Sequence, residues 1–206
     1  VTSAGSVGSA VITSLSNARF QSVNMTTSGG SFLFICNGAD APRHWNGSAW
    51  ATPTLGSVTA ANIINVEVYK ERLFFVLKDS LTYGYLPVNA VAGTVASVNL
   101  GSVFSKGGKI MAIATWTRDG GAGPDDNILF FTDQGEIAMY SGTDPSDATK
   151  WGLVGVYTVG RPIGHRCMLK VGSDCYLVTE NGLLPMTQVL GTGEAAPNVA
   201  LSDKIS

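Results

Sequence analysis

Residues 127–151 read NILFFTDQGEIAMYSGTDPSDATKW, and their pattern indicates the fold of the chain. Its first apolar run is short, rich in residues that favour strands, and closed by Gln134-Gly135, where glycine supplies the positive φ of a tight turn. A second apolar run and an Asp-rich segment follow before Trp151. The pattern predicts strand, turn, strand, turn and an anchoring tryptophan, which together form one unit of antiparallel sheet.

The same unit recurs along the chain. Three further stretches join a strand-like run to a turn signal: FLFICNG (32–38), RLFFVLKDS (72–80) and CYLVTENG (175–182). The turn residues are Gly38, Ser80, Gly135 and Gly182, at intervals of 42, 55 and 47 residues. One central hairpin in each forty-odd residues is typical of a β-propeller blade. We therefore expect an all-β, β-propeller-like fold of about four blades, whole or as a fragment of a larger propeller, with a β-sandwich as the alternative.

Additional hairpin signals lie between these units. HWNGSAW (44–50) places Asn-Gly between Trp45 and Trp50, which predicts a cross-strand aromatic pair. Residues 62–77 alternate apolar and polar side chains up to Lys70-Glu71, which predicts two strands around a turn rather than a helix.

Composition excludes several classes of function. The chain has 206 residues, of which 45% are hydrophobic and 14% charged, and it carries a net charge of −2. These values indicate a folded domain with no general affinity for nucleic acid or acidic membranes. No apolar run approaches the 18 residues of a membrane span. The lack of an initiator Met and the ending LSDKIS lead us to expect a single domain, 1–206, excised from a longer protein.

Four acids in the opening stretch raise the question of catalysis. Asp133 and Glu136 flank one turn, and Asp144 and Asp147 lie in the next. Glycosidases need two carboxyl groups held about 5–10 Å apart. Asp is also favoured in turns, where its side chain accepts hydrogen bonds from nearby backbone N–H groups, and this explains all four acids without catalysis. We expect no catalytic residue, no cofactor and no enzyme activity.

A candidate metal site lies in TRDGGAGPDDN (117–127), which we predict to be a loop insertion. Its Asp119, Asp125 and Asp126 offer oxygen ligands of the kind that Ca²⁺ prefers. Their spacing matches neither an EF-hand nor an RTX repeat, and a solvated loop with three glycines is the favoured interpretation of the segment.

A basic cluster lies in GRPIGHRCMLK (160–170). Arg161, His165 and Arg166 form a candidate contact surface for a phosphate backbone or an acidic subunit, with Lys170 close by in sequence. The three cysteines have no regular spacing, and two of them fall inside apolar runs, so we expect buried free thiols.

Three segments resemble a family of tailed-bacteriophage virion proteins. They are the DSLTYGYLPV hairpin (79–88), the GGKIMAIATW strand (107–116) with the Asp- and Gly-rich stretch after it, and GTDPS…W…GVY…GRPIG (142–164). The resemblance spans roughly residues 65–190. It implies a structural component of the particle near the tail or the head–tail junction, where propellers of short-tailed phages form rings around the DNA channel. The match carries no functional residue over.

The expected function is therefore a structural part of a phage virion that acts through protein–protein contacts. Its partners would be other virion proteins and copies of itself in a ring, with DNA in the channel as a further partner and no membrane. Two alternatives stay open. A carbohydrate-binding adhesin would use Trp45, Trp50 or Trp151, and a glycoside hydrolase would use two of the acids.

Overall fold

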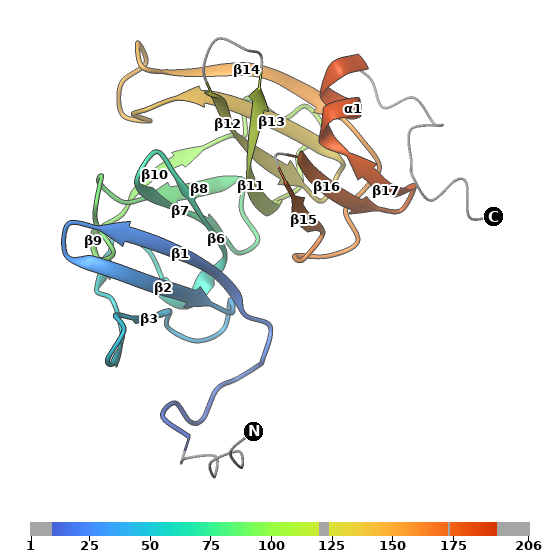
Figure 1. Ribbon diagram of the computed structural model, residues 1–206. Helices are drawn as coiled ribbons and strands as arrows, with labels where there is room; N and C mark the ends of the chain where they lie inside the picture. Colours follow the sequence, from blue (N-terminus) through green and yellow to red (C-terminus); the bar gives the residue numbers. More distant parts are fainter. Residues whose placement is uncertain (1–9, 120–123, 173, 193–206) are drawn as a thin grey trace, which may run out of the picture.

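The computed structural model of the chain describes residues 10–119, 124–172 and 174–192 (Figure 1). These residues form four antiparallel sheets that succeed one another along the chain as the blades of a β-propeller, together with a short parallel pair. The predicted all-β fold with four blades is confirmed. The β-sandwich alternative is wrong, because the sheets pack side by side in sequence rather than as two opposed layers.

Each sheet is built from consecutive hairpins. The first contains β1 (Gln21–Thr27), β2 (Gly30–Cys36), β3 (Arg43–Trp45) and β4 (Trp50–Ala51). The second contains β6 (Ile63–Tyr69), β7 (Arg72–Leu77), β8 (Thr82–Tyr85) and β10 (Ala96–Asn99). The third contains β11 (Ile110–Asp119), β12 (Pro124–Thr132), β13 (Glu136–Gly142) and β14 (Trp151–Thr158). The fourth contains β15 (Met168–Val171), β16 (Asp174–Thr179) and β17 (Gly182–Pro185).

The remaining elements are short. β5 (Leu55–Gly56) and β9 (Gly93–Thr94) form the parallel pair, η1 spans Ala60–Asn62, and α1 spans Met186–Thr192. In the part of the chain that the structure describes, no helix has the length and apolarity needed to cross a bilayer.

The predicted turns are confirmed where the structure describes them. Lys70 and Glu71 both adopt positive φ (46° and 59°) and join β6 to β7. Such a pair matches the right-handed twist of the two strands. Trp45 lies opposite Trp50 across β3 and β4, with ring centroids 5.6 Å apart. The local turn chemistry therefore sets the hairpin registers as the sequence predicts.

The predicted loop insertion at 117–127 is largely wrong. β11 continues to Asp119 and β12 begins at Pro124, with Thr117 paired opposite Asp126. Pairing through these polar residues satisfies backbone donors and acceptors that a loop would leave to water. The 55-residue interval thus contains the two longest strands of the fold, while residues 120–123 lie outside the described part.

Three hydrophobic clusters of described residues hold the sheets together. The first and second sheets meet around Phe34 and Phe75, and the second and third around Phe74, Tyr83 and Phe130. The third and fourth meet in a cluster that includes Phe131. Each cluster joins consecutive sheets, so the second and third sheets are packed on both faces.

The innermost strands surround a common axis. β6 lies against both β1 and β11, and β11 lies against β16 of the fourth sheet. A cavity of about 370 Å³ is lined by residues of β1, β6, β11 and β15. The first strand of every sheet therefore faces this axis, as in a propeller.

The first and fourth sheets share no hydrophobic cluster among the described residues. Arg166 reaches across this gap, and its Nη2 donates to the carbonyl oxygen of Phe20, 2.5 Å away. The face of the fourth sheet turned away from the third carries Leu169, 54% exposed, and Val171, 51% exposed. Tyr176 pairs with Leu169 on this face and is partly exposed. We call Leu169, Val171 and Tyr176 the seam face.

Candidate functional site

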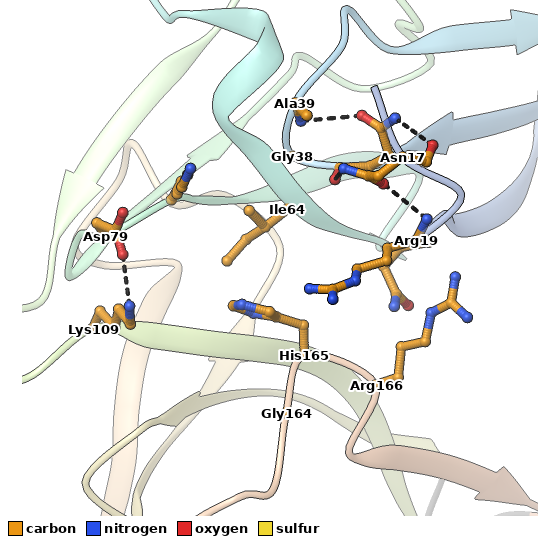
Figure 2. Close-up of a pocket in the computed structure, with 13 residues that line it drawn as sticks. Asn17, Arg19, Gly38, Ala39, Ile64, Asp79, Lys109, Gly164, His165 and Arg166 are labelled. Carbon is orange, nitrogen blue, oxygen red and sulfur yellow. Dashed lines mark hydrogen bonds and ion pairs between the residues drawn. The ribbon is translucent and has the colours of Figure 1, made fainter. Parts of the chain in front are cut away.

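The site that involves all four sheets is a basin of about 620 Å³ at one end of the axis (Figure 2). Its walls come from all four sheets. The first sheet contributes residues 17–21 and 37–39, and the second contributes residues 78–79. Lys109 lies just before the third sheet, and residues 164–166 lie just before the fourth. The first strand of each sheet begins at this end, and in the first and second sheets the second strand returns to it, at residues 37–39 and 78–79. Antiparallel pairing thus gathers segments that are far apart in sequence.

The basin is basic. Arg19, Lys78, Lys109 and Arg166 line it, and Asp79 is the one carboxylate among its described lining residues. Lys109 Nζ lies 2.6 Å from Asp79 Oδ1, and this hydrogen bond holds the pKa of Asp79 below its ordinary value and raises that of Lys109. Four cations against one anion leave a surplus of positive charge in a chain whose net charge is −2.

His165 anchors the basin to the axis. Its Nδ1 lies 3.2 Å from the carbonyl oxygen of Met111, and because a carbonyl only accepts, Nδ1 carries the proton. Asn65 Nδ2 donates to the carbonyl oxygen of His165 over 3.4 Å. These bonds connect the inner strands of the second and third sheets with the segment before β15. The propeller's own axis is therefore bridged at this end.

The predicted basic cluster is only partly brought together. His165 and Arg166 line the basin, whereas Arg161 does not. The Arg161 Nη2 donates to Gln134 Oε1 over 3.2 Å, so this side chain lies on the β12–β13 turn. Its role as a contact residue stays a prediction.

Sequence reasoning missed Arg19, Lys78 and Lys109 as site residues. Arg19 and Lys109 precede the first strands of the first and third sheets, and Lys78 follows β7. Their positions next to strand ends are a signal in the sequence, since the ends of the inner strands meet around the axis. The intervening loops differ in length, so aligning the repeats on their turns does not bring these residues into register.

Glu136 is a structural carboxylate. It is 2% exposed and accepts hydrogen bonds from the Ser105 hydroxyl and from the backbone N–H groups of Ser105 and Lys106. Burial alone would raise its pKa, but these bonds outweigh it, and the pKa of Glu136 lies below its ordinary value. The charged form therefore fixes the segment that leads into β11.

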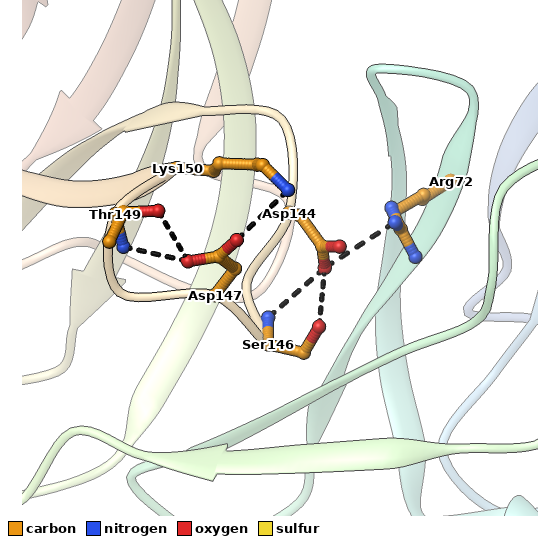
Figure 3. Close-up of polar contacts among 6 residues, drawn as sticks. All are labelled: Arg72, Asp144, Ser146, Asp147, Thr149 and Lys150. Carbon is orange, nitrogen blue, oxygen red and sulfur yellow. Dashed lines mark hydrogen bonds and ion pairs between the residues drawn. The ribbon is translucent and has the colours of Figure 1, made fainter.

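Asp144 and Asp147 stabilise the β13–β14 turn (Figure 3). Asp144 Oδ1 accepts from the backbone N–H and hydroxyl of Ser146, and it lies 3.4 Å from Arg72 Nη2 of β7. Asp147 accepts the same pair of bonds from Thr149, and these, with Lys150, lower the pKa of Asp147 to about 2. The turn interpretation of these acids is confirmed.

The two pairs of acids do not meet. Asp133 and Glu136 lie where β13 begins, and Asp144 and Asp147 follow its end at Gly142. A seven-residue strand spans roughly 20 Å at about 3.3 Å per residue, well beyond the 5–10 Å that a glycosidase needs. Neither Asp133 nor Glu136 therefore lies at a glycosidase spacing from Asp144 or Asp147.

Of the three predicted calcium ligands, the structure describes the side chain of Asp126. Asp126 Oδ2 lies 2.6 Å from Lys70 Nζ, and its Oδ1 accepts from the Thr117 hydroxyl. Both oxygens are thus engaged by protein groups, and the bond from Lys70 lowers the pKa of Asp126. The side chains of Asp119 and Asp125 lie outside the described part, so their role as ligands stays a prediction. Within that part, no group of three or more acidic, His or Cys side chains is placed to hold a metal.

The tryptophans of the adhesin alternative lie in different sheets. Trp45 and Trp50 pack on each other in the first sheet. Trp151 lies between Phe74 and Tyr140, nearly parallel to both rings, at centroid distances of 5.8 and 5.6 Å. Trp151 is therefore a packing residue between the second and third sheets, and it does not share a concave site with the other two.

The cysteines are free and buried, as predicted. Burial raises the pKa of Cys36, Cys167 and Cys175 to about 12 each. Such thiols stay protonated at neutral pH and are poor nucleophiles and poor metal ligands.

The fold and the axial basin define a β-propeller with a basic mouth. No protein-family model matches the chain, and no curated protein matches it significantly. Among solved structures, the chain is similar to one described as YCF48 bound to a D1 peptide, with 16% sequence identity and a TM-score of 0.41. The match covers 75% of this chain and 46% of that one.

Proposed function

We propose that the protein is a structural component of a bacteriophage particle, in the tail or at the head–tail junction, where it acts through protein–protein contacts. The seam face carries this proposal. A propeller blade normally packs on two neighbours, and the described fourth sheet packs on one. Leu169 and Val171 are about half exposed, although their strand runs beside the axis.

An uncovered apolar sheet face favours association with another chain. Burying the side chain of a Leu or Val stabilises a contact by about 1.5–3 kcal/mol when burial is complete. The partner is another virion protein or a second copy in a ring, and the protein is located in the virion. If the ring surrounds DNA, the channel lies between the copies, because the axis of each propeller is bridged by His165.

The remaining support comes from the resemblance of residues 79–88, 107–116 and 142–164 to virion proteins and from the structural use of the acids. Hydrogen bonds of 2.6–3.1 Å hold turns and loops in place through the carboxylates of Asp144, Asp147 and Glu136. A scaffold that presents rigid blades requires this kind of reinforcement.

The test compares two matched substitutions in particles assembled with the variant protein. Val171→Asp places a charge on the seam face, and Val154→Asp places the same charge on β14, where Val154 is equally exposed at 50%. We expect Val171→Asp to lower incorporation into purified particles at least about tenfold, since an unpaired buried charge costs a contact more than ~1.4 kcal/mol. Val154→Asp should incorporate normally. Equal incorporation of both variants would show that the seam face makes no contact needed for assembly.

A further inference from the structure

The axial basin has the positive charge of an anion-binding site. The described side chains that line it do not supply enough negative charge to neutralise it. The guanidinium of Arg19 and the ammonium of Lys78 make no hydrogen bond or ion pair with any described residue. Both groups nevertheless line the same concave volume as Lys109 and Arg166. Bringing four like charges around one cavity is unfavourable unless an anion neutralises them.

The positions of these groups come from four different blades. Arg19 precedes β1, Lys78 follows β7, Lys109 precedes β11, and Arg166 lies two residues before β15. Figure 2 shows Lys109 on one side of the opening, Arg19 and Arg166 on the other, and His165 between them. The cations that line this one cavity therefore come from every blade.

We propose that this basin binds a compact polyanion, a molecule that carries two or more phosphate or carboxylate groups. Arg19 offers a planar pair of donors suited to bidentate recognition of such groups, Arg166 offers the guanidinium nitrogens that do not bond to Phe20, and Lys78 and Lys109 contribute point charges. The basin's volume of about 620 Å³ lies in the usual range of small-ligand pockets. The cations surround one depression rather than forming an extended stripe, so a nucleic-acid backbone fits the surface less well.

Asp79 limits the strength of the site. Its Oδ1 forms an ion pair with Lys109 Nζ, 2.6 Å away. A bound anion must displace this carboxylate from the lysine. Asp79 is 60% exposed and adopts positive φ, a conformation that Asn tolerates as well as Asp. Asp79→Asn therefore removes the competing charge without straining the turn. We expect this variant to bind the anion more tightly.

The experiment measures binding of pyrophosphate and of citrate to the purified protein by calorimetry, with thermal unfolding as a second readout. Ionic strength is held constant with sodium chloride, so that screening is equal in every sample. We expect at least one of the two anions to bind with a dissociation constant below about 1 mM and to raise the unfolding temperature. A preference for pyrophosphate assigns a phosphate ligand, and a preference for citrate assigns a carboxylate ligand.

Four variants test whether binding occurs in the basin. Arg19→Gln and Lys78→Gln remove charged groups that make no hydrogen bond or ion pair with described residues, so the fold should not change, and each should weaken binding about fivefold. Asp79→Asn should strengthen it by a similar factor. Arg161→Gln, a cation outside the basin, is the matched control and should leave binding unchanged. The proposal is overturned if neither anion binds below about 1 mM, or if Arg161→Gln weakens binding as much as Arg19→Gln does.

Discussion

At the scale of single residues, the acids of the opening stretch are structural. Glu136 receives three hydrogen bonds from the segment before β11, and the Asp144 and Asp147 carboxylates each receive two within their own turn. Asp and Ser at turn positions were predictable from sequence, because their side chains bond locally. The partners of Glu136 were not, because Ser105 lies 31 positions away and no local pattern connects them.

Glu136→Gln should lower the free energy of unfolding by about 2 kcal/mol at pH 7, since it removes the charge from a buried acceptor of three bonds. The folded pKa of Glu136 lies below its ordinary value of 4.5, so its stabilisation is complete above that value and is lost as the pH falls through the folded pKa. Urea denaturation from pH 7 to pH 4 should show the difference between wild type and variant shrinking at the acid end. A difference that stays constant with pH would refute the role of the charge.

Gly135 is required by both its backbone and its surroundings. It has φ of +76°, and a Cβ there would collide with the carbonyl oxygen of Val159. Gly135→Ala should destabilise the protein by about 2 kcal/mol or more. Gly107→Ala is the control, because Gly107 has φ of +65° but no atom within 4 Å of the added Cβ, so about 1 kcal/mol of strain remains. Equal losses in thermal unfolding would show that the collision contributes nothing.

At the scale of elements, the hairpins were predictable and their packing was not. The turn at Lys70-Glu71 and the Trp45–Trp50 pair depend on neighbouring residues, and both appear as predicted. The length of β11 and β12 was missed, because polar residues at 117–119 and 124–127 pair through the backbone without any hydrophobic signal. The basic basin was missed because its residues meet only through the arrangement of the sheets.

The second and third sheets are joined by aromatic packing. Phe130 of β12 is fully buried and stacks on Tyr83 of β8, with centroids 4.5 Å apart. Phe130→Ala should cost about 4 kcal/mol, and Phe130→Leu, which fills most of the volume, about 1.5 kcal/mol. Chemical denaturation of the three proteins measures this order. A loss below about 1 kcal/mol for the alanine variant would contradict close packing at this interface.

At the scale of the whole molecule, packing is uneven around the axis. The second and third sheets are covered on both faces, whereas the first and fourth share no described hydrophobic cluster. Local opening is easiest where few apolar contacts hold an element. In hydrogen exchange, we therefore expect the amides of β7 and β12 to be protected longest and those of β15 and β16 to exchange first. Equal protection in all four sheets would indicate that the seam is closed in solution.

We propose that this propeller is a part of a phage particle. Quantitative mass spectrometry of intact, gradient-purified particles tests this proposal, with the crude lysate as the reference for expression. The proposal predicts peptides of this chain in the particles at a fixed ratio to the major structural proteins, unchanged by repeated purification. Peptides that are abundant in the lysate but absent from the purified particles would contradict it.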